Sequence, residues 1–236
     1  MSKVAIIAAL ERELTPLVKG WTREQHIAAG RQIILFKSDN AIAACGGMGT
    51  VAARQTTDYV LRTHAEVEAV ISVGLAGALT PELKVSAIIW PRVIIDEADG
   101  LKIEMEEGSG ILVTASVIAE QDLKQALASR FSADAVDMEA YAVGDVARIH
   151  KRRFVAIKAI SDELTFPMPP LGKFVTTDGQ FETGKFAFYA AMRPWMWPTV
   201  IQLGRNSARA TAALSLELQQ ALQRFLHEKS SQVPVK

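Results

Sequence analysis

Cysteine and an excess of charge are what this sequence most clearly lacks. Its 236 residues include a single cysteine, and 26 Lys and Arg balance 26 Asp and Glu, so the formal net charge is zero at pH 7. Because Cys45 alone cannot form a disulfide within the chain, a reducing, cytoplasmic compartment is expected. Proteins that bind nucleic acid usually carry a basic excess, so nucleic acid is not expected as a main partner.

Long apolar runs are also absent. No segment approaches the roughly 18 apolar residues that a membrane-spanning helix needs. The run from Val4 to Leu10 is short and leads directly into Glu11-Arg12-Glu13. It also lacks the small-residue cleavage site of a signal peptide. We therefore expect neither a signal peptide nor a membrane span.

Three common kinds of reactive site are missing as well. No Gly-x-Gly-x-x-Gly follows the first apolar run, which argues against a nicotinamide enzyme. The four histidines show no metal-ligand spacing, and no serine occupies a Gly-x-Ser-x-Gly elbow. We expect no cofactor, no metal ion and no serine-hydrolase chemistry.

Apolar β-type runs alternate with helical patterns along most of the chain. The sequence predicts strands at residues 4–9, 32–37, 41–45, 69–73, 87–95, 111–114, 135–138 and 154–160. It predicts helices at residues 11–19, 50–64, 119–129, 139–149 and 199–226. This alternation indicates one three-layer α/β/α domain with a central mixed, largely parallel twisted sheet. We assign the domain to residues 1–228, with an apolar segment at 166–200, and expect a flexible tail at 229–236.

Acidic and glycine-rich segments stand where predicted strands end, the usual place for a ligand in such folds. These segments are residues 11–13, 46–49, 74–77, 137–139 and 161–163. The turn at 46–49 precedes a helix, so its backbone amides could face a ligand. Singly, each segment also fits a tight turn or a solvated acid. Together, Glu13, Glu139 and Asp162 fit cleavage of a glycosidic bond, because one carboxylate must protonate the leaving group and another must activate the nucleophile.

Five motifs in order resemble the superfamily of purine nucleoside phosphorylases and methylthioadenosine/S-adenosylhomocysteine nucleosidases. They are AALEREL (8–14), GGMG (46–49), GLAGAL (74–79), VDMEA (136–140) and AISDE (159–163). The resemblance covers residues 3–165 and implies that Asp162 protonates, or hydrogen-bonds to, the purine N7, with Ser161 orienting it. It further implies that Glu139 binds the ribose hydroxyls, that Met138 packs on the sugar, and that Glu13 holds and activates water.

Several positions depart from the family pattern. Lys158 stands where the family often has an arginine near the general acid, and Leu75 stands where nucleosidases usually have a serine. Val117 and Ile118 replace the aromatic partner of the base. The resemblance places Lys158 in the substrate pocket, together with three further residues: Met48, Ala76 and Gly77.

The nucleophile is expected to be water. Phosphorylases usually cradle phosphate with arginines, but Ile71-Ser72-Val73 contains none, and Glu13 would repel the anion. Arg12 and Arg54 are the nearest cations in the sequence. A phosphate-dependent phosphorylase remains the alternative.

The segment from Phe166 to Trp197 is rich in Phe, Met, Pro and Trp, and resembles the hopanoid-associated branch of the superfamily. That resemblance implies removal of adenine from adenosylhopane, with Trp195 and Trp197 contacting the substrate. The aromatic residues could instead complete the core or a dimer interface.

The five motifs also fit a soluble methylthioadenosine or S-adenosylhomocysteine nucleosidase, or a non-catalytic nucleoside-binding protein on the same fold. The family implies a homodimer or larger oligomer. A lipid-linked nucleoside would allow peripheral contact with the inner membrane face.

Overall fold

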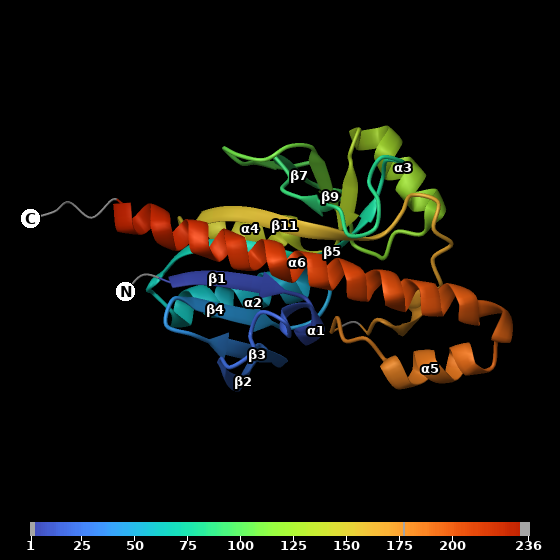
Figure 1. The fold of residues 1–236 in the computed structure, drawn as a ribbon, viewed down its shortest axis with the longest axis horizontal. Helices are drawn as coiled ribbons and strands as arrows, with labels where there is room; N and C mark the ends of the chain where they lie inside the picture. Colours follow the sequence, from blue (N-terminus) through green and yellow to red (C-terminus); the bar gives the residue numbers. More distant parts are fainter. Residues whose placement is uncertain (1–2, 177, 232–236) are drawn as a thin grey trace, which may run out of the picture.

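The computed structural model describes residues 3–176 and 178–231, with side chains described as far as Phe225. Within these residues, eleven strands form one sheet at the centre of the molecule (Figure 1). The strands are β1 (Lys3–Ala8), β2 (Thr22–Ala28), β3 (Arg31–Lys37), β4 (Ala41–Cys45), β5 (Val67–Ala78), β6 (Ile88–Ile89), β7 (Val93–Asp96), β8 (Lys102–Glu104), β9 (Ile111–Thr114), β10 (Ala135–Asp137) and β11 (Arg153–Asp162).

The sheet is parallel at its centre and mixed toward its edges. Its main order is β2-β3-β4-β1-β5-β10-β9-β7-β8, and β11 pairs with β5 and β6. β1 runs parallel to β4 and β5, and β11 runs parallel to β5. In contrast, β10 meets β5 in antiparallel register, with Val136 opposite Gly77. Several loops that follow strands therefore converge on one end of β5.

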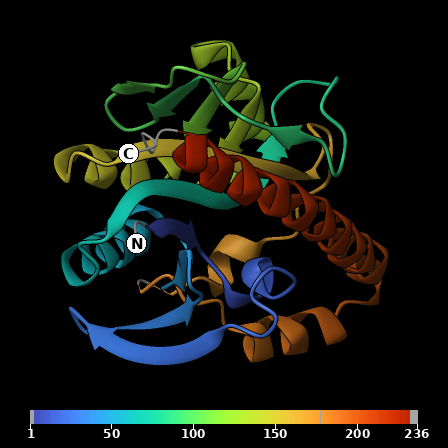
Figure 2. The same cartoon turned by 60° about the vertical axis from the view of Figure 1, so that its left-hand side comes forward.

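Helices cover both faces of this sheet, as Figures 1 and 2 show. They are α1 (Glu11–Leu14), α2 (Thr50–Thr63), α3 (Gln121–Phe131), α4 (Ala140–Ile149), α5 (Thr183–Ala191) and α6 (Trp197–Ser231), with 3-10 helices η1 (Leu171–Phe174) and η2 (Pro194–Met196). On one face, Val60 of α2 and Val143 of α4 pack against strand residues such as Ile42. On the other, Leu214 and Leu218 of α6 are fully buried in a cluster with β1, β5 and β11. The expected three-layer α/β/α class is confirmed.

Some elements differ from their predicted extents for local reasons. The helix expected at 11–19 ends at Leu14, because Pro16 lacks the N–H that a continuing helix requires. The strand expected at 87–95 divides into β6 and β7, interrupted at Trp90-Pro91. Residues 74–77 belong to β5 and do not form a loop. β2, β8 and α5 were not predicted.

The C-terminal helix α6 is longer than predicted and continues to Ser231. Of the tail expected at 229–236, residues 232–236 lie outside the described residues. Among the helices that the structure describes, none is long and apolar enough to cross a membrane.

Candidate active site

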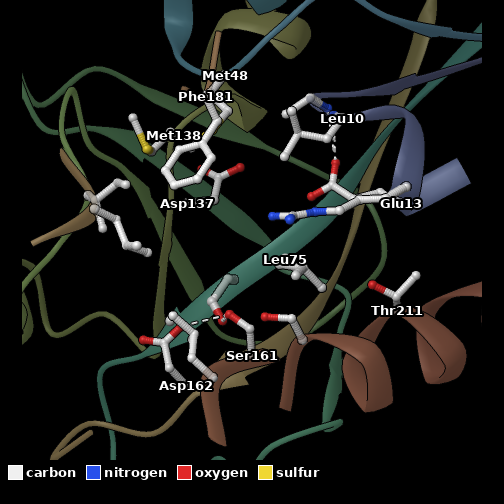
Figure 3. Close-up of a pocket in the computed structure, with 18 of the residues that line it drawn as sticks. Leu10, Glu13, Met48, Leu75, Asp137, Met138, Ser161, Asp162, Phe181 and Thr211 are labelled. Carbon is white, nitrogen blue, oxygen red and sulfur yellow. Dashed lines mark hydrogen bonds between the residues drawn. The ribbon is translucent and has the colours of Figure 1, made fainter. Parts of the chain in front are cut away.

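A cavity of about 1130 Å³ lies where β1, β5, β10 and β11 meet (Figure 3). Its wall includes Leu10 after β1, Leu75 in β5, Asp137 of β10 and Asp162 at the end of β11. Its volume is slightly above the usual range for small-molecule pockets, about 300–1,000 Å³. The loop-rich end of a largely parallel sheet centre is also where α/β enzymes bind their ligands.

Most of the residues predicted to form the site line this one cavity. All three predicted catalytic carboxylates, Glu13, Glu139 and Asp162, are in its wall. So are these predicted substrate contacts: Met48, Ala76, Gly77, Val117, Ile118, Met138 and Ser161. Lys158, Trp195 and Trp197 are not in the wall. The structure therefore gathers motifs that are far apart in the sequence, and the roles of the residues remain predictions.

Glu13 projects from α1 and is anchored by the backbone that precedes it. Its Oε2 accepts hydrogen bonds from the Ala9 amide at 3.1 Å and the Leu10 amide at 3.0 Å. Burial raises the pKa of Glu13, although the Leu10 hydrogen bond and the nearby Lys158 oppose the increase. The carboxylate points from α1 toward the cavity in Figure 3. A fixed carboxylate with a raised pKa is suited to accept a proton from a bound water.

Glu139 precedes α4 and is held from two sides. Its Oε1 accepts a hydrogen bond of 2.8 Å from the Gly49 amide, and its Oε2 accepts one of 3.3 Å from the Met138 amide. Burial raises the pKa of Glu139 to about 7, and repulsion from Asp137 acts in the same direction. Glu139 therefore changes its charge near neutral pH.

The glycine-rich turn at 46–49 positions protein groups, and its amides are already hydrogen-bonded. The Gly47 amide donates to the Ala9 carbonyl at 3.1 Å, and the Met48 amide donates to the Gly179 carbonyl at 2.8 Å. Gly49, with φ of +89°, donates to Glu139 from a conformation that L-residues rarely adopt. Of the two interpretations of this segment, the hydrogen bonds favour a tight strand-to-helix turn over bare amides that face a ligand, because Glu139 and two carbonyls already accept from the amides of residues 47–49.

Asp162 at the end of β11 lies between a hydroxyl and a buried ammonium. Ser161 Oγ donates a hydrogen bond of 2.6 Å to Asp162 Oδ1. Lys124 of α3 forms an ion pair with Asp162 Oδ2 and also donates to the Glu163 carbonyl at 2.9 Å. The Lys124 side chain is only 1% exposed and also lines the cavity. Sequence reasoning missed Lys124; the available signal was a lysine placed one helical turn before the apolar Leu127.

Gly77 makes room for this ion pair. A Cβ atom at position 77 would lie 2.9 Å from Asp162 Oδ2 and 3.0 Å from Lys124 Cε. Gly77 also stands opposite Asp162 in the register of β5 and β11. A side chain here would push the carboxylate and the ammonium away from the sheet. Gly77 was predicted as a pocket residue, and it contributes space to the site.

Lys158 lies beneath the cavity wall, in the centre of β11. Its ammonium forms a fully buried ion pair of 2.8 Å with Asp137 Oδ2 and donates to Ser72 Oγ at 3.2 Å. Asp137 Oδ1 also accepts a hydrogen bond of 2.7 Å from Thr114 Oγ1. Burial alone would lower the pKa of Lys158, but the carboxylates of Asp137, Glu139 and Glu13 outweigh it and raise that pKa. Lys158 thus supplies positive charge beneath the carboxylates of the site.

The predicted apolar segment forms part of the wall, but its two tryptophans lie outside it. The contribution of the segment comes from Met168, Leu171, Phe181 and Phe186. Trp195 and Trp197 are 73% and 49% exposed, and Trp197 Nε1 donates to the Ala190 carbonyl at 2.9 Å.

One face of α6 contributes ten residues to the cavity wall. It comprises Val200, Leu203, Gly204, Ser207, Ala208, Thr211, Ala212, Ser215, Leu216 and Gln219. These positions recur every three or four residues, as one helix face does, and span about 28 Å along the axis at 1.5 Å per residue. Most of them are small, and we call the part of the cavity that they line the channel. Helical periodicity predicted a helix at 199–226, but it did not assign these positions to a ligand site.

The comparison with protein families decides the family. Residues 3–108 and 94–186 match the model of the phosphorylase superfamily. The chain belongs to this superfamily. Among the described residues, no group of three or more His, Cys, Asp or Glu side chains could hold a metal ion.

Individual relatives are distant in sequence but similar in fold. Aminodeoxyfutalosine nucleosidase from Campylobacter jejuni is 22% identical over 199 residues, which cover 69% of this chain and 86% of that protein. The Helicobacter pylori 5′-methylthioadenosine/S-adenosylhomocysteine nucleosidase superposes with a TM-score of 0.70 and 16% identity, over 94% of this chain and 98% of that one. Helicobacter pylori futalosine hydrolase superposes with a TM-score of 0.64 and 19% identity, over 92% of this chain and 96% of that one. The predicted family and enzyme class are confirmed, and the narrower adenosylhopane assignment stays a prediction.

Proposed function

We propose that the protein hydrolyses the N-glycosidic bond of an adenosyl substrate and releases adenine. The observation that carries this proposal is the arrangement of Glu13, Glu139 and Asp162. Three separate elements place these carboxylates in the wall of one cavity, as cleavage of a nucleoside requires. The relatives named above are nucleosidases and a hydrolase of nucleosides, which agrees with this chemistry.

The leaving base would bind beside Asp162. As the bond between C1′ and N9 breaks, its electron pair passes to the purine, and N7 takes up a proton from Asp162. Lys124 and Ser161 hold the side chain of Asp162 in place, and the proton that Asp162 gives to N7 is replaced from solvent before the next turnover. A positioned general acid typically accelerates such a step by about 10²–10⁴-fold.

The sugar and the water would bind on the other side of the cavity. Glu139 would accept hydrogen bonds from the ribose hydroxyls, with Met138 packed on the ring. The developing oxocarbenium ion is stabilised by negative charge nearby. Glu13 would hold a water against C1′ and take its proton as the new C–O bond forms, which gives a free ribosyl product.

The substrate that we favour is adenosylhopane, an adenosyl group joined to a rigid hydrocarbon. The α6 face supports this choice, because its small residues extend the cavity by much more than a nucleoside needs. Burying a hydrocarbon there would contribute about 25 cal/mol per Å² of apolar surface removed from water. Such a substrate resides in a membrane, which implies a cytoplasmic enzyme with peripheral contact at the inner membrane face. The superfamily resemblance also favours a homodimer or larger oligomer.

The alternatives to this substrate and mechanism are a small nucleoside, phosphate as the nucleophile, and a protein without catalytic activity. A small nucleoside, as in the methylthioadenosine/S-adenosylhomocysteine nucleosidases, would occupy only the carboxylate end of the cavity. A phosphorylase could use Arg12, which lines the cavity. Against phosphate, Arg54 pairs with Asp145 at 2.7 Å, and the amides at 47–49 are engaged. A non-catalytic nucleoside-binding protein is disfavoured because three carboxylates in one cavity, two of them buried, are costly to maintain.

The decisive experiment is a substrate panel with and without phosphate, monitored for free base and for the sugar product. The panel would contain adenosylhopane, methylthioadenosine, S-adenosylhomocysteine and inosine. We expect phosphate-independent release of adenine, fastest from adenosylhopane. Ribose-1-phosphate that forms only when phosphate is added would establish a phosphorylase instead. Absence of free base from every member would leave a binding protein.

A further inference from the structure

An exposed apolar surface lies on the hairpin that α5, η2 and the start of α6 form. We call it the hairpin surface; it comprises Phe188, Met192, Trp195, Trp197 and Ile201, which are between 49% and 73% exposed. The hairpin extends beyond the sheet at the right of Figure 1. Phe186 of α5 does not belong to this surface, because it packs against Phe174 and Phe181 and lines the cavity.

The segment that carries the hairpin surface is basic. Residues 183–216 contain four basic residues and no Asp or Glu, whereas the whole chain has equal numbers of each. The four are Lys185, Arg193, Arg205 and Arg209. Lys185 pairs with Glu182 just before the segment, and the Arg193 guanidinium stacks 3.6 Å from the centre of the Tyr189 ring. Arg205 and Arg209 are exposed on α6.

The hairpin surface is continuous with the cavity. Along α6, Trp197 and Ile201 precede Gly204, Ala208 and Ala212 at steps of three or four residues, so all five lie on one helix face. The last three line the cavity. One apolar face therefore leads from the exposed tip of the hairpin toward the carboxylates.

We propose that the hairpin surface docks on an anionic phospholipid bilayer and presents the mouth of the cavity to the membrane. Trp side chains prefer the membrane interface, where their rings lie at the level of the head groups. Apolar and aromatic residues flanked by arginines, without acids, are typical of helices that lie in this interface. Docking would let a lipid-linked nucleoside enter the cavity without crossing water. This purpose rests on the proposed function.

Charge favours a bilayer over a second copy of the chain as the occupant. In a two-fold symmetric dimer, the same patch meets itself. The arginines of one hairpin would then face the arginines of the other, which is unfavourable. Anionic head groups complement the same residues.

The test uses the full-length protein and flotation with vesicles of phosphatidylcholine, alone or mixed with phosphatidylglycerol. We expect at least about tenfold more protein bound to the anionic vesicles, and a decrease as ionic strength rises, since salt screens surface charge. The variant Phe188→Ser/Trp195→Ser should lower binding by about tenfold or more, because it removes the apolar anchors. Arg205→Glu/Arg209→Glu should remove the preference for anionic lipid.

A matched control distinguishes binding through the hairpin surface from nonspecific adsorption by any exposed apolar residue. Leu101 and Ile149 are 58% and 64% exposed on other elements, so Leu101→Ser/Ile149→Ser should bind vesicles like the wild type. Equal losses in both apolar variants, or no wild-type binding to anionic vesicles, would overturn the proposal. So would a shift from dimer to monomer in Phe188→Ser/Trp195→Ser with vesicle binding unchanged, because the surface would then join two copies. Flotation needs no turnover, so a failure of docking and a failure to release adenine are distinguishable.

Discussion

The ammonium of Lys124 lies against the carboxylate of Asp162, and the two side chains are only 1% and 6% exposed. A buried ion pair becomes costly when one partner is removed, since the other is left without compensation. Lys124→Met should therefore lower the free energy of unfolding by about 3–5 kcal/mol. The double variant Lys124→Met/Asp162→Asn should recover part of that loss. Urea unfolding of the wild type, both single variants and the double variant would measure the coupling, and simple additivity would contradict it.

Asp162→Asn should lose adenine release while still folding, although the loss of the charged partner of Lys124 lowers its stability. Asparagine preserves the size of the side chain but cannot supply the proton, so the rate should decrease about 100-fold or more. Asp145→Asn is a suitable control, because Asp145 pairs with Arg54 and lies outside the cavity wall. An Asp162→Asn enzyme that kept more than about a tenth of the wild-type rate would exclude the general-acid role.

Glu139 should impose a pH dependence near neutrality. Burial raises its pKa to about 7, and only the ionised form accepts two hydrogen bonds from ribose hydroxyls. kcat/KM should therefore rise as pH increases through that value. The pKa of Glu13 is also raised, and Glu13 must be ionised to act as a base. The acidic limb of log kcat/KM should thus approach a slope of about two, and Glu139→Gln should reduce it to about one.

The same residue can be tested through the substrate. Loss of a charge-assisted hydrogen bond should cost about 1.5–3 kcal/mol, so 2′- and 3′-deoxy analogues should react more slowly in the wild type. In Glu139→Gln the penalty for removing a hydroxyl should shrink. If the wild type treats ribosides and deoxyribosides alike, Glu139 does not bind the sugar.

Glu13→Gln should abolish turnover in buffer free of phosphate. Glutamine can keep the hydrogen bond from Leu10 but cannot take a proton from water. Added phosphate should not restore activity in this variant or accelerate the wild type. A phosphate-dependent rate in either protein would replace the hydrolytic mechanism with phosphorolysis.

The α6 face should discriminate substrates by the size of their apolar group. Ala212→Phe narrows the channel and should slow an adenosyl substrate with a long hydrocarbon by about tenfold or more, while a small adenosyl nucleoside reacts at the wild-type rate. Gln220→Phe is the control, because Gln220 is exposed on the same helix and lies outside the cavity wall. Comparable losses on both substrates would indicate a folding defect instead.

The sequence predicted the carboxylates well because they belong to local motifs. Glu13 and Glu139 come shortly after buried strands, and Asp162 ends one. β1 and β11 both run parallel to β5, which brings Glu13 and Asp162 to the same end of the sheet. β2 was missed for a physical reason. It is an edge strand with mostly polar, partly exposed residues, so it lacks the apolar alternation that reveals a strand.

Lys124 and the α6 face could not be predicted in the same way. Lys124 meets Asp162 across 38 positions of sequence, and the contact depends on how α3 packs beside β11. Likewise, the sequence shows Ala208 and Ala212 only as residues that favour a helix. They line the cavity because α6 passes beside the sheet at this point. The surroundings of such residues depend on tertiary packing. Helical periodicity predicts the helix but not what each of its faces contacts.

The catalytic carboxylates and the apolar wall of the cavity come from different parts of the chain. This separation affects how the enzyme could change its substrate. The carboxylates come from α1, the start of α4 and the end of β11, all within the residues that match the superfamily, whereas the match ends at residue 186, before α6 begins. Mutations along α6 can reshape the channel without displacing any carboxylate. A lineage could therefore exchange one apolar substituent for another while bond cleavage stays under selection, and a laboratory library confined to residues 200–219 would explore the same freedom.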